Sequence, residues 1–219
     1  MNRIQSRETR TRVILALSVT FKVNGWLTIQ ARGNMVYWAD KLRQKFYAST
    51  ATALCGVNGR YLEMDYQETQ MYGDVMAMFK KTWGDFTLDA AIGGSINDKV
   101  VNSTRIDSKN ASLKFANVFN LANIVMSSSA SIDQKIDAHY QLQSVFATAQ
   151  AGYKEGVFLD LTARNDWSST LAYTKYEKKG FFYPSIGVSF LPDKWVKMPE
   201  WVSFSKLRGA YSIVGNLSL

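Results

Sequence analysis

Charged side chains at regular spacing are the residues of this sequence that could carry out chemistry. Asp160, Arg164 and Asp166 follow one another at spacings of four and two, so they share one face if the segment is a β-strand. Two neighbouring carboxylates could act as a general acid and a general base. Charged side chains that line the watery interior of a large barrel explain the same pattern without catalysis. We favour this second interpretation.

No other set of residues predicts an enzyme. The single Cys55 and the single His139 leave no Cys/His set for a structural zinc and no nucleophile–base pair. Gly93-Gly94 is not followed by the GK[ST] of a phosphate loop, and it predicts a kink or a close backbone approach within a strand. We therefore expect neither catalysis nor a bound metal or cofactor.

The element that positions these charges is a hairpin over residues 144–171. Its first arm alternates small and apolar residues with polar ones, apart from Phe146. In its second arm Leu159 and Leu161 alternate with the charged row. Each arm is longer than the ~5–6 residues of an ordinary strand. Strands of ~9–11 residues with one polar and one apolar face are typical of membrane-spanning barrels.

The same alternation recurs along the chain and predicts an all-β, antiparallel up-and-down meander of about eight long strands. The predicted strands cover residues 15–23, 27–37, 67–80, 86–97, 137–154, 157–166, 182–190 and 203–211. The predicted connections alternate in length, with short ones at 24–25, 81–85, 154–156 and 192–202 and longer ones at 39–66, 98–134 and 170–180. Outer-membrane barrels have short turns on one side and long loops on the other.

Composition and charge pattern argue against a nucleic-acid partner, a signal peptide and a transmembrane helix. The 26 Lys and Arg against 18 Asp and Glu give a net charge of +8, but they are scattered along strand-like runs, so we expect no nucleic-acid partner. The basic start MNRIQSRETRTR is followed by an alternating segment that predicts a strand and no signal peptide. No run of 18 apolar residues predicts a transmembrane helix.

Two groups of side chains are candidates for contact with a passing solute. The charged residues expected to face a barrel lumen are Arg32, Asp74, Asp89, Asp160, Arg164 and Asp166. The aromatic residues that could contact a ligand are Trp38, Tyr61 and Trp167, although we favour an outer aromatic girdle as the explanation for them. Further aromatics beside the predicted short turns fit an interfacial girdle: Trp26, Trp83, Tyr153, Trp195 and Trp201.

Several segments closely resemble the SusC/RagA class of TonB-dependent outer-membrane transporters, and together they cover nearly the whole chain. They are QSVFATAQAGYKEGVFLDLTARNDWSSTL, GFFYPSIGVSFL and LPDKW…PEWVSFSKLRGAYSIVGN, with NGWLTIQARGN, QKFYAST and NVFNLANI before them. The resemblance implies a barrel of about 22 strands around an N-terminal plug. It also implies the outer membrane of a Bacteroidota-type cell and its lipid, a SusD-like surface lipoprotein, energy from the TonB system, and import of oligosaccharides or, in some members, peptides.

Several parts of that class are not in the sequence. We find no signal peptide, plug domain or TonB box, and the chain ends on a VGN loop instead of a C-terminal aromatic strand. We therefore expect residues 1–219 to be a partial TonB-dependent receptor β-barrel domain, an interior slice of a transporter. The alternative is a complete small eight-stranded outer-membrane barrel with a structural or adhesion role, because eight strands suffice for closure.

Overall fold

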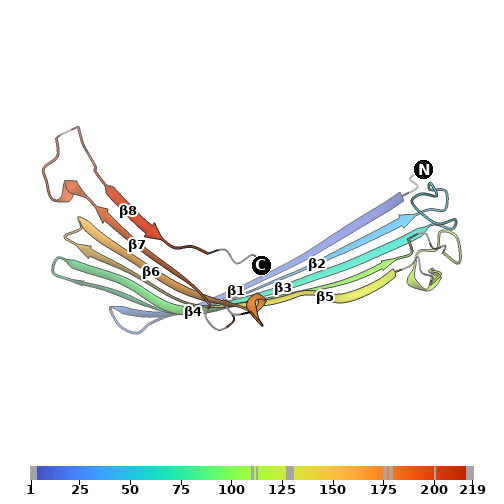
Figure 1. Ribbon diagram of the computed structural model, residues 1–219, viewed down its shortest axis with the longest axis horizontal. Coiled ribbons are helices and arrows are strands. Elements are labelled where there is room, and N and C mark those ends of the chain that lie inside the picture. The colour runs from blue at the N-terminus through green and yellow to red at the C-terminus, as the bar shows by residue number, and fades with distance from the viewer. Residues whose placement is uncertain are drawn as a thin grey trace. The chain divides into compact units, whose positions relative to one another are not determined.

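The chain forms one open sheet of eight antiparallel strands, in which each strand pairs with the next in sequence (Figure 1). The structure, a computed structural model, describes residues 4–109, 111, 113–126, 131–174, 177, 180–199 and 201–215. The strands are β1 (Ile4–Lys22), β2 (Leu27–Phe46), β3 (Arg60–Trp83), β4 (Phe86–Asp107), β5 (Ser131–Tyr153), β6 (Val157–Ser168), β7 (Phe181–Phe190) and β8 (Leu207–Ser212). The predicted fold class, an all-β meander, is confirmed.

The sheet has β1 and β8 as its two edges. A complete eight-stranded barrel would pair these two strands with each other, so the structure does not support that alternative. In the described parts of the connections there are three short 3-10 helices, at Leu121–Asn123, Ser169–Leu171 and Pro192–Lys194. Among the residues that the structure describes, none of the helices combines the length and the hydropathy needed to cross a membrane.

Strands β1 to β5 are longer than the sequence predicts. The predicted connections 39–66 and 98–134 are wrong in extent, because β2 continues to Phe46, β3 begins at Arg60, β4 continues to Asp107 and β5 begins at Ser131. The added residues carry polar and charged side chains on both faces. They therefore lack the polar–apolar alternation by which a strand is recognised.

The last connection also differs from the prediction. Instead of the short turn predicted at 192–202, residues 191–206 join β7 to β8. The boundaries of β6 and β7, in contrast, match the predicted strands closely. Part of the predicted connection 170–180 lies outside the described residues; Gly180 at its end is described and has φ of 63°.

The tight turns follow different chemistry from that expected. Asn24-Gly25 predicts a type I′ turn, but neither residue has positive φ. Instead, the Asn24 side-chain oxygen accepts hydrogen bonds from the backbone N–H groups of Trp26 and Leu27, at 3.0 and 2.9 Å. Positive φ at two successive residues occurs instead in the three-residue loop of the β5–β6 hairpin, where Lys154 and Glu155 have φ of 49° and 50°. The predicted hairpin around 154–156 is confirmed.

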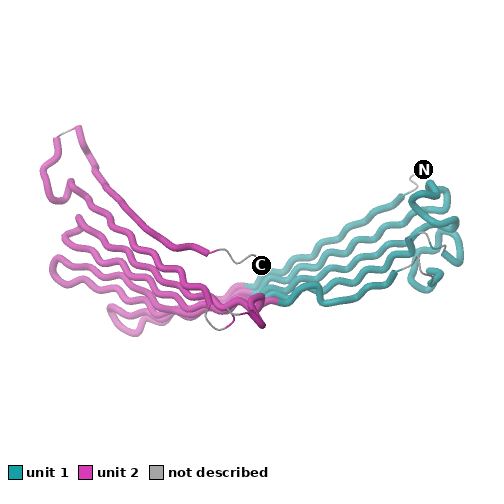
Figure 2. Tube along the Cα trace, viewed as in Figure 1, with its two compact units in different colours: residues 1–15, 35–70, 99–139 teal, residues 16–34, 71–98, 140–219 magenta. Residues whose placement is uncertain are grey.

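The chain divides into two compact units (Figure 2). Unit 1 comprises residues 1–15, 35–70 and 99–139, and unit 2 comprises residues 16–34, 71–98 and 140–219. Strands β1 to β5 contribute to both units, whereas β6, β7 and β8 belong to unit 2 alone.

Unit 1 has a small core where the β2–β3 and β4–β5 connections pack on the strand ends. The buried side chains of Tyr61, Leu113 and Ile124 form its centre, and Ile106 and Phe119 pack against them. Asn58 donates a 2.7 Å hydrogen bond from its side-chain amide to the backbone carbonyl of Leu113, so the two connections are also linked through polar groups.

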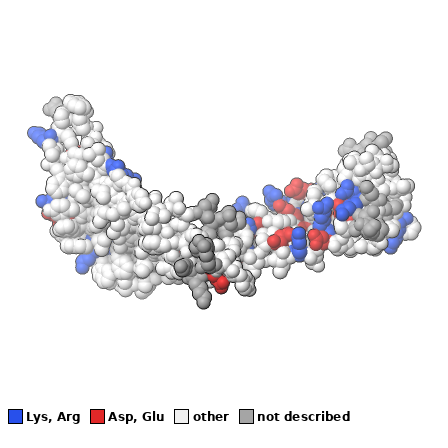
Figure 3. Space-filling model, in the orientation of Figure 1, with Lys and Arg blue, Asp and Glu red and all other residues white. Residues whose placement is uncertain are grey.

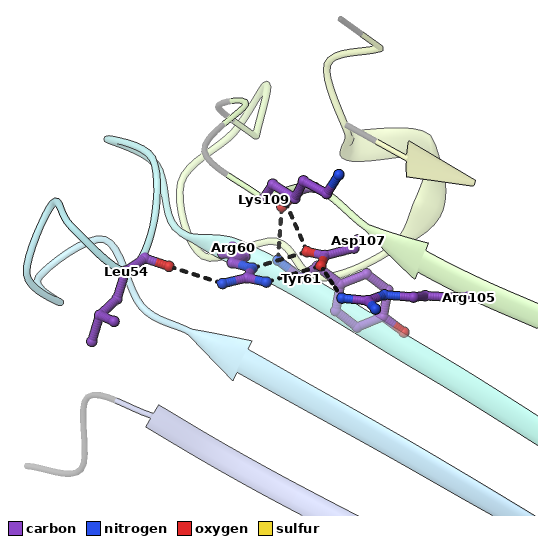
Figure 4. Close-up of polar contacts among 7 residues, drawn as sticks. Leu54, Arg60, Tyr61, Arg105, Asp107 and Lys109 are labelled. Carbon is purple, nitrogen blue, oxygen red and sulfur yellow. Dashed lines mark hydrogen bonds and ion pairs between the residues drawn. The ribbon is translucent and has the colours of Figure 1, made fainter. Parts of the chain in front are cut away.

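A buried carboxylate ties the end of β4 to the start of β3 in the same unit (Figure 4). The Asp107 side chain has no solvent exposure, and its oxygens accept hydrogen bonds of 2.9 Å from Arg60, from Arg105 and from the backbone N–H of Lys109. Burial opposes ionisation of Asp107, but these hydrogen bonds outweigh it and lower the pKa of the carboxyl. The connections of unit 1 are thus held by charge as well as by packing.

Unit 2 has one apolar face and one polar face. The register of β5 to β8 places Ala149, Leu161, Ile186 and Tyr211 opposite one another in one row. Leu161, Ile186 and Tyr211 are 42%, 46% and 68% exposed, and on β4 Ile92 is 53% exposed. Side chains that alternate with this row point to the other face. We call these the apolar face and the polar face of unit 2.

Charge is distributed very differently over the two units. Figure 3 shows a face on which Lys, Arg, Asp and Glu gather over unit 1, whereas unit 2 carries few of them. In unit 1 charged pairs occur at two consecutive residues of β2: Asp40 accepts a hydrogen bond from Arg10, and Lys41 lies 3.3 Å from Glu63. Since neighbouring residues of a strand point to opposite faces, both faces of unit 1 carry charge.

Candidate substrate-facing surface

The six charged candidates all lie in unit 2, on its polar face. Arg32 on β2 forms an ion pair of 3.1 Å with Asp74 on β3. Further along β3, Lys80 lies 3.8 Å from Asp89 on β4, and even-numbered residues of β3 share one face. A Cβ atom added at Gly93 of β4 would touch both Met76 of β3 and Phe146 of β5, so the polar face is continuous from β3 to β5.

Asp160, Arg164 and Asp166 on β6 continue this face, and none of them is isolated. Arg164 donates from Nε to Asp166 at 2.7 Å and from Nη2 to the hydroxyl of Ser144 at 2.8 Å. Asp160 accepts a 2.6 Å hydrogen bond from the side chain of Gln150. The arrangement pairs Asp166 with a cation instead of with a second carboxylate, so it lacks the coupled carboxylates of acid–base catalysis.

The three aromatic candidates are dispersed by the fold. Trp38 lies in unit 1, on β2, with its ring 6.5 Å from that of Tyr66. Its indole Nε1 is buried and has no hydrogen-bond partner among the described residues. Tyr66 in turn donates to Glu68, which pairs with Lys99 at 2.9 Å. Trp38 therefore lies beside a polar network formed by residues of β3 and β4, and it is not part of the core of Tyr61, Leu113 and Ile124.

Tyr61 and Trp167 are placed where a solute in contact with the polar face would not meet them. Tyr61 is 5% exposed in the core of unit 1, and its hydroxyl donates to Glu63. Trp167 pairs with Gln143 across the β5–β6 ladder and alternates with Asp166, which puts its ring on the apolar face. There it borders a groove of about 670 Å³ together with Ile96 and Val145. This position fits the girdle interpretation of Trp167.

The aromatic residues near the short turns form contacts that sequence reasoning did not specify. In unit 2 the ring of Trp26 stacks on Phe79 at 6.0 Å, and Tyr153 lies between Phe86 and Trp195 at 4.7 and 5.7 Å. The Lys154 ammonium lies 5.4 Å from the ring of Tyr153. Trp195 and Tyr153 thus meet although they come from different connections, which only the fold reveals.

In unit 1 the ion pairs are strong enough to shift ionisation. Arg10 binds both carboxylate oxygens of Asp40, at 2.6 and 2.7 Å, and its hydrogen bond lowers the pKa of Asp40. A hydrogen bond to Asp65 raises the pKa of Lys41. Burial, assisted by Glu63, raises the pKa of Tyr61 to about 12. No three His, Cys, Asp or Glu side chains within the described ranges could together hold a metal ion.

Comparison with known proteins gives matches among solved structures. The chain is similar to "Structure of the RagAB peptide importer in the 'closed-closed' state", with a TM-score of 0.83 and 18% identity over 97% of this chain and 23% of that chain. The corresponding structure in the 'open-open' state has a TM-score of 0.82 and 18% identity, over 96% of this chain and 23% of that chain. "Structure of the RagAB peptide transporter" has a TM-score of 0.83 and 17% identity, over 96% of this chain and 23% of that chain. No protein-family model and no curated protein matches.

The chain spans about a quarter of the length of these solved chains, of which it covers 23%. At 17–18% identity the likeness concerns the path of the backbone. It supports the predicted resemblance independently of the sequence motifs. The eight-stranded open meander of this chain therefore has the fold of a segment of a SusC/RagA-type transporter.

Proposed function

We propose that this chain is a segment of the membrane-spanning barrel of a TonB-dependent outer-membrane importer. The observation that carries the proposal is the contrast between the two faces of unit 2. An exposed apolar face suits lipid, and a polar face with paired charges suits a watery lumen. Residues 1–219 then form part of a receptor barrel domain whose other parts belong to the same longer protein.

The six polar-face charges are, on this proposal, lumen-facing residues of the importer. Their pairing within the wall supports this role, because the pairs Arg32–Asp74 and Arg164–Asp166 keep charge on the surface without leaving an ion unpaired. Unit 1 carries charge on both faces, which suits a region in contact with water.

The solutes of this importer are oligosaccharides or peptides, and it works with a SusD-like surface lipoprotein and the TonB system. The resemblance of the motifs supports these partners, and the RagAB structures add a peptide importer with the same segment fold. The location that follows is the outer membrane of a Bacteroidota-type cell.

Uptake by cells provides the test. A strain that lacks the full-length gene is compared with the complemented strain for depletion of two mixtures, neutral oligosaccharides and a tryptic digest of casein. We expect the complemented strain alone to deplete one mixture, and a protonophore to abolish the depletion because TonB-dependent uptake uses the proton gradient. Equal depletion by both strains would contradict the proposed transport.

A further inference from the structure

A row of four hydroxyl groups crosses the polar face of unit 2. The register of β5 to β8 places Thr148 opposite Thr162, Thr162 opposite Ser185, and Ser185 opposite Ser212. Thr148, Thr162 and Ser212 are exposed, and Ser185 is half-buried. Neighbouring strands are about 4.8 Å apart, so the row extends over about 14 Å. Such hydroxyls both donate and accept hydrogen bonds and carry no charge.

Aromatic rings flank this row on one side. Phe146 and Tyr183 stand directly opposite Arg164, on β5 and β7 respectively, in the next row of the same face. Both rings and the hydroxyl row line a groove of about 340 Å³. Gly215, which follows β8, packs beside Tyr183: a Cβ atom there would lie 2.9 Å from the ring. The ring therefore has a fixed neighbour on one side.

The charges beside the groove are already engaged. Arg164 uses Nε and Nη2 on Asp166 and Ser144, and Asp160 accepts from Gln150 on the other side of the row. A ligand in the groove thus meets apolar ring surface, uncharged hydroxyls and a guanidinium that is neutralised by its own carboxylate. A peptide bound to a sheet usually pairs its backbone with an edge strand, whereas three of the four strands beneath this groove, β5, β6 and β7, are interior strands of the sheet.

We infer that the groove of Phe146, Thr148, Thr162, Tyr183, Ser185 and Ser212 is a binding subsite for a neutral sugar ring. A pyranose has an apolar face that packs on an aromatic ring and a rim of hydroxyls that pairs with the row. The inference rests on the proposed function, because it assumes that this face lines the route of the solute. It selects the oligosaccharide from the two solute classes named there.

The test uses two matched sets of variants in the full-length importer, with the two mixtures described above. Thr148→Val with Thr162→Val removes two hydroxyls and keeps the shape, and Thr28→Val makes the same change on the polar face of β2, outside the row. Two neutral hydrogen bonds correspond to roughly tenfold in affinity. We expect the double variant to deplete oligosaccharide roughly tenfold more slowly at limiting solute, and Thr28→Val to match the wild type.

A second pair separates ring stacking from folding. Tyr183→Phe keeps the ring and should retain uptake, whereas Tyr183→Ala should lose most of it, with heat-modifiable gel mobility showing that both variants fold. Depletion of peptide instead of oligosaccharide, or a double variant that equals Thr28→Val, would overturn the subsite while leaving the importer intact. A wild type that depletes neither mixture would remove the importer and the subsite together.

Discussion

Asp107 is a buried charge that ties the connections of unit 1 to β3 and β4. Its carboxylate is fully buried and pairs with Arg60 and Arg105. If the carboxylate were removed, these two arginines would lose the counterion that balances their charges. Breaking a buried pair by removing one partner costs more than the pair contributes, because the remaining charge is left without a counterion. The same logic does not apply to exposed pairs, whose net contribution is about 0–1 kcal/mol.

We therefore expect Asp107→Asn to loosen the connections of unit 1. The amide keeps the shape but loses the charge, so local stability should fall by roughly 1–3 kcal/mol. Hydrogen exchange of residues 47–59 should become faster in the folded protein. Asp89→Asn is the control, since Asp89 is exposed and 3.8 Å from Lys80. Unchanged exchange in Asp107→Asn would contradict the role of this carboxylate.

Tyr61 gives the loops a dependence on high pH. Burial raises its pKa to about 12 in the folded protein, above the ordinary value of 10.0. A raised pKa means that the neutral form is favoured by folding, so the contribution to stability is complete below pH 10 and is lost as pH rises toward 12. The difference in tyrosinate absorbance between wild type and Tyr61→Phe should titrate near 12. A difference that titrates near 10 would show that Tyr61 is exposed.

The turns offer the clearest comparison between elements. Gly84 between β3 and β4 has φ of 56°, whereas Gly25 between β1 and β2 does not have positive φ, and a Cβ atom at either would meet nothing within 4 Å. Only backbone conformation separates the two sites. Gly84→Ala should destabilise by about 1 kcal/mol, because alanine is strained in the left-handed region. Gly25→Ala should be neutral or stabilising by about 0.4–1 kcal/mol.

The measurement is the denaturant midpoint of each variant in the refolded full-length protein, with the slope checked for equality. The two variants should move the midpoint in opposite directions, or Gly84→Ala alone should lower it. A larger loss for Gly25→Ala would mean that the β1–β2 turn adopts the type I′ conformation that its sequence suggests.

The elements of unit 2 could be predicted from the sequence because one physical cue sufficed. Where one face is apolar and the other polar, as in Val157–Ser168, the period of two is visible and the strand boundaries follow. In residues 39–46 and 98–107 both faces carry polar side chains, so these parts of β2 and β4 form strands although their sequence does not alternate between polar and apolar residues. On β2 and β4 the alternation of polar and apolar residues ends near the residues where unit 2 gives way to unit 1.

The candidate site shows the same limit at the level of single residues. The common face of Asp160, Arg164 and Asp166 follows from their spacing, but their partners Gln150 and Ser144 depend on the register, which two residues of slippage would change. Tyr61 could not be assigned to the loop core from sequence, because its neighbours Leu113 and Phe119 come from a distant connection. The hydroxyl row likewise exists only after four strands are aligned.

For the molecule as a whole, the membrane-spanning role requires that the apolar face of unit 2 meets lipid. The twelve residues of β6 extend over about 40 Å at 3.3 Å per residue, enough to cross an apolar band about 25 Å tall even with a tilt of 35–45°. Leu161 and Thr162 are adjacent in the middle of this strand and point to opposite faces. The same substitution at Leu161 and at Thr162 therefore tests which face of β6 meets lipid, because the two variants differ by one position in the chain.

The folding of two arginine variants shows which face of β6 meets lipid. In the full-length protein, Leu161→Arg puts a charge on the apolar face, which costs about 2–4 kcal/mol near the bilayer midplane, whereas Thr162→Arg puts it in the watery lumen at little cost. Heat-modifiable gel mobility in detergent should show a much lower folded yield for Leu161→Arg than for Thr162→Arg. Equal yields, or a lower yield for Thr162→Arg, would contradict the assignment of the two faces and the membrane-spanning role of this sheet.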